Sequence, residues 1–290
     1  MPKRPSQAHG VAIDPEHPGR YSSSLVAGLA MLRCFTAEHP IRGIADMADT
    51  LELGRSTTHR FATTLVALGF LEQGASRKYW LSPRASDVGI ALCESMPVRR
   101  VARGHLRELR SRTGYTVSLA VLGGSEIVYI DRWQGSRQGQ YAIDEGIGPG
   151  ARRPVYCTAA GKAIAARLPA AEQRKLVTEL KLQRLGPNTL TSKAALRAEL
   201  ERIATGDDAI VVEDEELLSG RRALAAAVLD GEGRPGAAVE LAVPGAYAVE
   251  ELVSSFGSQV SDVVGRVSSA LQQQSGDQSH RSTTNSSGEV

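Results

Sequence analysis

The sequence predicts an α+β protein with two domains, and three observations support this prediction. The chain has 290 residues, which is enough for two domains that each bury a core. Its first third holds short helical patterns followed by a β-hairpin pattern, and the remainder alternates β-rich runs with helical ones. Its composition, 42% hydrophobic and 23% charged, is that of an ordinary globular protein.

The N-terminal domain is predicted to span residues 21–83, after a tail at 1–20 that has too few apolar residues to fold. Serines at 22–24 can cap a first helix. The His39-Pro40 step ends this segment, because the residue before a proline disfavours the helical region. The residues at helical spacing, which we expect to face the core, are Leu25, Leu29, Leu32 and Phe35.

Residues 44–80 form the most informative stretch of the chain. Apolar residues between Ile44 and Leu51 recur at positions i, i+3, i+4 and i+7 of a short helix, and Leu53-Gly54 supplies a tight turn into a second helix. After Gly69, two short alternating runs form a hairpin. These elements in this order predict a helix-turn-helix with a β-hairpin wing. The predicted buried residues of the second helix are Phe61, Leu65 and Leu68.

The second helix begins with a run of hydrogen-bonding and cationic side chains, at the end that a helix-turn-helix presents to the major groove of DNA. The formal net charge of +2 is close to neutral, so a contact with nucleic acid must come from a local patch such as this one. A helical hairpin followed by a β-hairpin also occurs in many small domains, which is the alternative interpretation. The predicted DNA-binding residues are Arg55, Ser56, Thr57, Thr58, His59, Arg60, Arg77 and Lys78.

A helical stretch at 84–103, interrupted by Pro97, is predicted to link the two domains. A helix in this position often makes a dimer contact, and a plain connector is the alternative. The C-terminal domain is predicted to span residues 104–271. The tail at 272–290 has almost nothing to bury, so we expect it to be unstructured.

The C-terminal domain is predicted to contain six strands with helices around them. Gly123-Gly124-Ser125 joins the first two strands as a hairpin, and a glycine-rich basic loop occupies residues 145–153. The predicted strands are Thr116–Leu122, Glu126–Arg132, Arg137–Asp144, Ala209–Val212, Arg222–Leu229 and Gly236–Ala242. The predicted helices are one that begins within 154–162 and ends at Leu168, then Ala171–Leu180, Lys193–Ala204 and Val249–Val267.

The sequence contains no complete catalytic set, metal-ligand set or cofactor motif. Cys34, Cys93 and Cys157 lie far apart without a C-x-x-C pair, which favours reduced thiols over disulfides or zinc. Gly161-Lys162 lacks the other residues of a phosphate-binding loop. The start of the chain lacks the apolar region of a secretory leader, so we expect a cytoplasmic protein without membrane contact. We expect no cofactor and no enzymatic activity.

Several motifs, in this order, resemble those of IclR-family transcriptional regulators over about residues 21–271. They are SLVAGLAMLRCF, GRSTTHRFATTLVALGFLE with RKYWLSPR, TVSLAVLGGSEIVYIDR, PVYCTAAGKAIAARLP, DEELLSG and RALAAAVLD. The form RRPVYCTAAGK is similar to the subgroup that regulates aromatic-acid catabolism, including the β-ketoadipate pathway. The resemblance implies a winged helix-turn-helix domain and a GAF-like α/β effector-binding domain. It also implies a homodimer or homotetramer that binds a palindromic DNA operator and a small-molecule effector.

The resemblance also implies which residues contact the effector, at the start of the helix after the central motif and on strands near the acidic segment. The helix start offers free N–H groups to a carboxylate, Arg152 and Arg153 would reinforce this site, and Tyr156 would stack on a ring. Two glutamates would repel a carboxylate unless they pair with arginine, so an organic acid, a polyol, an amine and a larger neutral ligand all stay open. The predicted effector-binding residues are Arg152, Arg153, Tyr156, Thr158, Ala159, Ala160, Gly161, Glu213, Ala223, Glu240 and Ala242.

The leading hypothesis is therefore a ligand-responsive transcription factor. The first alternative is a small-molecule-binding enzyme with a winged-helix appendage, which would need a catalytic constellation. The second is a structural DNA-binding protein that has no effector.

Overall fold

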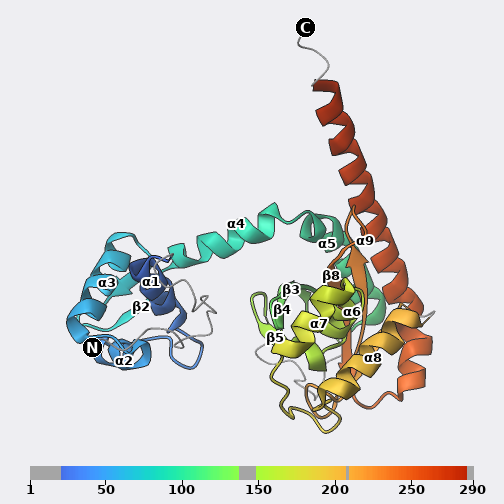
Figure 1. Ribbon diagram of the computed structural model, residues 1–290, viewed down its shortest axis with the longest axis horizontal. Helices are drawn as coiled ribbons and strands as arrows, with labels where there is room; N and C mark the ends of the chain where they lie inside the picture. The colour runs from blue at the N-terminus through green and yellow to red at the C-terminus, as the bar shows by residue number, and fades with distance from the viewer. Residues whose placement is uncertain (1–20, 137–147, 207–208, 286–290) are drawn as a thin grey trace. The chain divides into compact units, whose positions relative to one another are not determined.

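The computed structural model describes residues 21–136, 148–206 and 209–285, with side chains described as far as Gly276 (Figure 1). The chain divides into two compact units, and the division falls between Leu92 and Cys93. Each unit has its own hydrophobic core.

The N-terminal unit is a helix-turn-helix followed by a two-stranded hairpin, which confirms the predicted elements. Glu52, with φ +50°, and Gly54 make the turn between the two helices, and Leu71 pairs with Leu81 across the hairpin. The elements are α1 (Ser23–Arg33), α2 (Ile44–Leu51), α3 (Arg55–Ala67), β1 (Leu71–Gln73) and β2 (Tyr79–Leu81).

The two predicted core faces in this unit are only partly confirmed, because Phe35 and Leu65 are buried but three other predicted core residues are exposed. Leu25 and Leu29 of α1 are exposed, because the helix turns Ala30 and Met31 toward the core instead. Almost every residue of α1 is apolar or small, so its spacing could not define a single face. Leu68 is also exposed, since it is the C-cap of α3, after which the chain turns away at Gly69 (φ +79°). The buried core residues include Met31, Cys34, Phe35, Met47, Leu51, Ala62, Leu65, Leu71 and Tyr79.

Two helices, α4 (Asp87–Ser95) and α5 (Pro97–Thr113), follow the N-terminal elements. The predicted break at Pro97 is confirmed, since this proline opens α5, where its missing N–H leaves no hydrogen bond unmade. A short 3-10 turn, η2 (Pro83–Ser86), precedes α4, none of whose residues is buried. In contrast, α5 buries Ala102, Leu106, Leu109 and Thr113 and packs against α9 and β3 within the C-terminal unit.

The C-terminal unit is built on a six-stranded antiparallel sheet with strand order β5-β4-β3-β8-β7-β6. The predicted hairpin of the first two strands is confirmed. The predicted strand 137–144 and the first residues of the predicted loop 145–153 lie outside the described residues, and the last two residues of that loop instead belong to a short edge strand. The strands are β3 (Thr116–Gly123), β4 (Glu126–Trp133), β5 (Arg152–Pro154), β6 (Val211–Asp214), β7 (Arg221–Leu229) and β8 (Pro235–Pro244).

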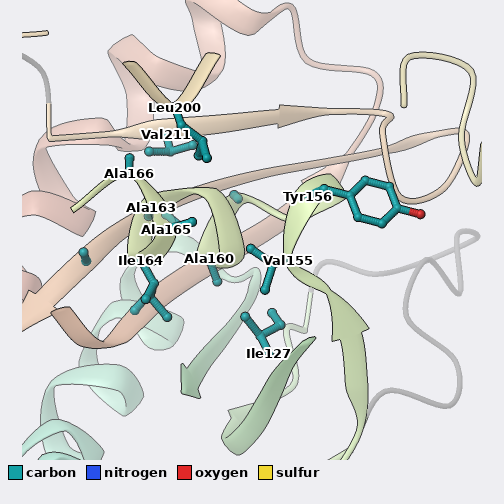
Figure 2. Close-up of a cluster of buried hydrophobic side chains, with 14 of the residues drawn as sticks. Ile127, Val155, Tyr156, Ala160, Ala163, Ile164, Ala165, Ala166, Leu200 and Val211 are labelled. Atoms are coloured by element: carbon teal, nitrogen blue, oxygen red, sulfur yellow. The ribbon is translucent and has the colours of Figure 1, made fainter. Parts of the chain in front are cut away.

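Helices cover both faces of this sheet (Figure 1). One core lies between the sheet and the group α6 (Ala159–Ala166), α7 (Ala170–Glu179) and α8 (Lys193–Thr205), and the other lies beneath α5 and α9 (Val249–Asn285). Figure 2 shows part of the first core, which includes Ile127 of β4, Val155 and Ile164 of α6. Successive side chains of a strand point to opposite faces of the sheet, so neighbouring residues of one strand belong to different cores.

Helix α9 continues to Asn285, so the prediction of an unstructured tail from residue 272 is wrong as far as that residue. Leu271 is still buried, and the Ser275 side chain approaches Gly231 so closely that an added Cβ there would clash with it. The helix is already formed by the packed segment before it, and adding residues to a formed helix is easier than starting one.

Candidate functional site

The outward side of α3 carries polar and cationic side chains. We call Arg55, Ser56, His59, Arg60 and Thr63 the α3 outer face, and all five are exposed. Thr57 is only half-buried, and with Arg60 it borders the groove between α1 and α3. The prediction did not include Thr63, although its position three residues after Arg60 places it on the same side of the helix.

Thr58 does not belong to this surface. Its side chain is fully buried, and its hydroxyl donates a hydrogen bond to the Gly54 carbonyl at 3.1 Å. Thr58, Ala62 and Leu65 follow one another at helical spacing on the core side of α3. The prediction, which was based on the polar residues at the start of the helix, therefore included Thr58 although the fold buries its side chain.

The tip of the wing presents two further cations. Arg77 and Lys78 are both exposed, and Arg77 has a φ of +56° in the hairpin turn. Lys78 Nζ lies 3.4 Å from Asp46 Oδ2 of α2. The Gly43 N–H and Lys78 lower the pKa of Asp46, whose side chain therefore stays ionised opposite this lysine. An exposed pair of this kind contributes little to stability, so Lys78 remains available to an external anion.

The second site is a group of charged side chains on the α6 side of the sheet, which we call the buried ion cluster. At its centre Arg221 of β7 contacts two carboxylates, with Nη1 2.5 Å from Glu213 Oε2 of β6 and Nη2 2.7 Å from Glu240 Oε1 of β8. All three side chains are at most 1% exposed. The other members are Tyr129, Lys162 and Glu216.

Glu240 connects the cluster to the start of α6. Its Oε2 accepts a hydrogen bond from the Ala160 N–H at 3.2 Å, and its Oε1 accepts one from the Tyr129 hydroxyl at 2.8 Å. The Thr158 side chain caps the helix by accepting from the Gly161 N–H at 3.2 Å. The Ala160 and Gly161 N–H groups at this helix start, which were predicted to be free, are therefore already occupied by the chain's own side chains.

Lys162 and Glu216 form the second half of the cluster. Lys162 Nζ donates to Glu216 Oε1 and, at 3.1 Å, to the Val212 carbonyl. The other oxygen of the Glu216 carboxylate, Oε2, is buried and has no hydrogen-bond partner among the described residues. Sequence reasoning missed Arg221, Lys162 and Glu216, and the only available signal was the requirement that buried glutamates be paired with an arginine.

Burial controls the ionisation of this cluster. Loss of water raises the pKa of Glu213 to about 6, with Arg221 and the N–H groups of Leu217 and Glu216 opposing that rise. Burial also raises the pKa of Glu216. Burial and the two glutamates raise the pKa of Cys157 to about 12, so its thiol stays protonated near neutral pH and is not an activated nucleophile.

The structure brings together only part of the predicted effector site. Ala223 and Ala242 are neighbours in register on β7 and β8, and Ala223 is also in register with Glu213 of β6. The start of α6 joins this group through the hydrogen bond between the Ala160 N–H and Glu240. The remaining three residues make their hydrogen bonds elsewhere. Arg152 pairs with Glu126, Arg153 donates to the Arg152 carbonyl, and the Tyr156 hydroxyl both donates to and accepts from Gln183, at the outer end of the ring in Figure 2.

Neither a metal site nor a membrane span is found in the part of the chain that the structure describes. No group of three His, Cys, Asp or Glu residues there is arranged to hold a metal ion. None of the described helices has the length and hydrophobicity needed to cross a bilayer.

The fold and these two sites define a class of protein, a winged helix-turn-helix domain joined to an α/β domain with a buried polar site. The chain belongs to the IclR family of bacterial transcriptional regulators. The model of the IclR C-terminal domain matches residues 90–269, and the IclR helix-turn-helix domain matches residues 24–75.

Three similar proteins illustrate this membership. The HTH-type transcriptional regulator XynR of Escherichia coli K12 is 30% identical over 249 residues, covering 86% of this chain and 96% of XynR. The crystal structure of a transcriptional regulator from Rhodococcus sp. RHA1 is 33% identical, with a TM-score of 0.75, and covers 87% of this chain and 99% of that one. An IclR homologue of Microbacterium hydrocarbonoxydans, crystallised with 4-hydroxybenzoate, shares the fold at 24% identity with a TM-score of 0.73, covering 87% of this chain and all of that one.

The family decides between the predicted classes of function. The named relatives are transcriptional regulators and not enzymes, so this chain is a DNA-binding transcriptional regulator of the IclR type.

Proposed function

We propose that this regulator binds a palindromic operator as a homo-oligomer, through the α3 outer face and the wing tip. The observation that supports this most directly is the exposure of Arg55, His59 and Arg60 on one side of α3, while the opposite side is core. Arginine can make a bidentate contact with guanine in the major groove, and serine or threonine hydroxyls can bond to bases or phosphates. Arg77 and Lys78 contact the phosphate backbone beside the groove.

Helix α4 supports the homo-oligomer. It has the sequence DVGIALCES, and none of its residues is buried, with Val88 67% exposed and Ile90 51% exposed. Apolar side chains on a helix without a packing partner are unfavourable in water. We propose that α4 of a second copy covers them, since a dimer of heads also matches the two half-sites of a palindrome.

The effector binds in the C-terminal domain, on the α6 side of the sheet. The 4-hydroxybenzoate complex of the Microbacterium hydrocarbonoxydans homologue supports a small-molecule site in a domain of this fold. A ligand that binds one conformation of this domain better than another shifts the population of the DNA-binding state by that difference in affinity.

Selection of genomic DNA fragments by the full chain, followed by footprinting, tests the DNA-binding part of this proposal. We expect protection of two inverted half-sites whose centres are about 34–36 Å apart or a multiple of that spacing. Sedimentation of the wild type and of Ile90→Glu tests the oligomer, and we expect the variant to dissociate. An unselective pattern of bound fragments, or an unchanged oligomer in Ile90→Glu, would contradict the corresponding part.

A further inference from the structure

The position at which an effector carboxylate would meet the start of α6 is already filled by the side chain of Glu240. This carboxylate receives hydrogen bonds from three different elements, through the Ala160 N–H of α6, the Tyr129 hydroxyl of β4 and the guanidinium of Arg221 in β7. These are the donors that a carboxylate needs: a helix N-terminus, a hydroxyl and an arginine. An external carboxylate would have to displace Glu240 to reach them.

The charge of the buried ion cluster also disfavours an anion. Its three carboxylates, Glu213, Glu216 and Glu240, face two cations, Arg221 and Lys162, so the fully ionised cluster has a net charge of −1. Each of the five side chains is at most 9% exposed. Glu199, whose Oε1 lies 3.8 Å from Lys162 Nζ, is itself paired with Arg202, so this outer pair adds no net charge. Charges interact strongly where water is excluded, so a second net negative charge in this place is unfavourable and a positive one is favourable.

One hydrogen-bond acceptor of the buried ion cluster has no donor among the described residues. Arg221 donates to two carboxylates, and Lys162 donates to Glu216 Oε1 and to the Val212 carbonyl. Glu216 Oε2 is the acceptor left without a partner among the described residues. A buried acceptor without a donor destabilises the state that contains it, so a ligand that brings an N–H group binds with an advantage.

We propose that the effector of this regulator carries a protonated amine, and that Glu240 determines this specificity by taking the place of an effector carboxylate. The inference rests on the proposed function, since it concerns the effector of the same domain. The amine donates to Glu216 Oε2 and balances the negative charge of the cluster. Small monocarboxylates, which have the opposite charge, are excluded by Glu240.

A pair of small probes of matched size and opposite charge tests this proposal in the full chain. Thermal unfolding is followed with ethylamine hydrochloride and with sodium acetate at equal ionic strength. For the wild type we expect ethylamine to raise Tm by about 3–6 °C at ten times its Kd, and acetate to leave Tm unchanged. An equal response to the two salts, a larger response to acetate or no response to ethylamine would overturn the proposal.

The variant Glu240→Ala removes the internal carboxylate and leaves the Ala160 N–H and Arg221 without it. We expect the preference to reverse, so that acetate now raises Tm and ethylamine does not. An acetate response no larger than that of the wild type would overturn the role of Glu240. If this variant does not fold, Glu240→Gln keeps the shape and loses the charge, and we expect it to lose the ethylamine response without gaining one to acetate.

Glu126→Gln, at the exposed pair with Arg152, is the matched control, and we expect it to keep the wild-type preference for ethylamine. Operator binding by the same preparations separates this inference from the proposed function. A wild-type chain that binds its operator but prefers acetate contradicts the amine effector alone, whereas one that selects no operator contradicts the proposed function.

Discussion

The α3 outer face and the buried ion cluster use the same residue types in opposite ways. Arg60 on α3 is exposed and makes no ion pair with another described residue, whereas Arg221 is 1% exposed and pairs with two glutamates. The cations of the first site remain in water, where the partner that we propose for them, DNA, can reach them. The charges of the second site have lost their water, so the fold must supply partners for them. For Arg60 and Arg221, burial therefore distinguishes a side chain that is free to bind a partner from one that supports the fold.

The largest expected loss of stability follows substitution of Arg221. Arg221→Ala leaves Glu213 and Glu240 buried without their counter-charge, so we expect the free energy of unfolding to fall by about 3–5 kcal/mol. Denaturant unfolding of the full chain measures this loss. The control is Arg234→Ala at an exposed pair with Glu172, for which we expect a loss below about 1 kcal/mol. Losses of similar size in the two variants would show that burial does not distinguish these arginines.

Arg60→Ala tests the exposed arginine of the α3 outer face. We expect it to weaken operator binding by about 1–3 kcal/mol, because a base-contacting arginine is lost, with no change in unfolding. Fluorescence anisotropy with the selected operator gives the affinity. Arg197→Ala, an exposed arginine of α8 in the other unit, is the control and should bind as the wild type does. Unchanged affinity in Arg60→Ala would remove this residue from the interface.

Glu213 is expected to make the stability of the buried ion cluster depend on pH. Its folded-state pKa, about 6, is above its ordinary value of 4.5, so between these pH values the folded chain binds more protons than the unfolded chain. Stability from this group therefore increases as pH falls from about 6 to 4.5, by about 2 kcal/mol, and is lost as pH rises. As pH falls from about 6 to 4.5, we expect the unfolding free energy of the wild type to rise relative to that of Glu213→Gln. A difference between the two that does not change with pH would contradict the raised pKa.

Lys78 is expected to contribute little to stability and to act mainly in operator binding. Its pair with Asp46 is half exposed, so Lys78→Ala should change the unfolding free energy by less than about 1 kcal/mol. The same substitution should lower the salt dependence of operator binding by about one phosphate contact, seen as a slope smaller by about 1 in a plot of log affinity against log salt concentration. An unchanged slope would mean that Lys78 does not contact the phosphate backbone.

Local patterns in the sequence predicted most of the elements. The helix-turn-helix, the break at Pro97, the hairpin around Gly124 and the final helix all depend on spacing, glycine or proline within a short window. Local patterns did less well where almost every residue of a helix was apolar or small, as in α1, or where a polar residue turned inward, as Thr58 does.

The sequence by itself determined which segments are helices and strands, and which cations stand at the start of the recognition helix, because these properties depend on neighbours in the chain. Only the tertiary structure decided the content of the second site. Lys162 meets a carbonyl 50 residues away, and Glu240 meets the start of α6 80 residues away, in a place that the sequence had assigned to an effector. Such pairings depend on which strands lie side by side and on the loss of water between them. The spacing of residues along the chain predicts neither of these properties.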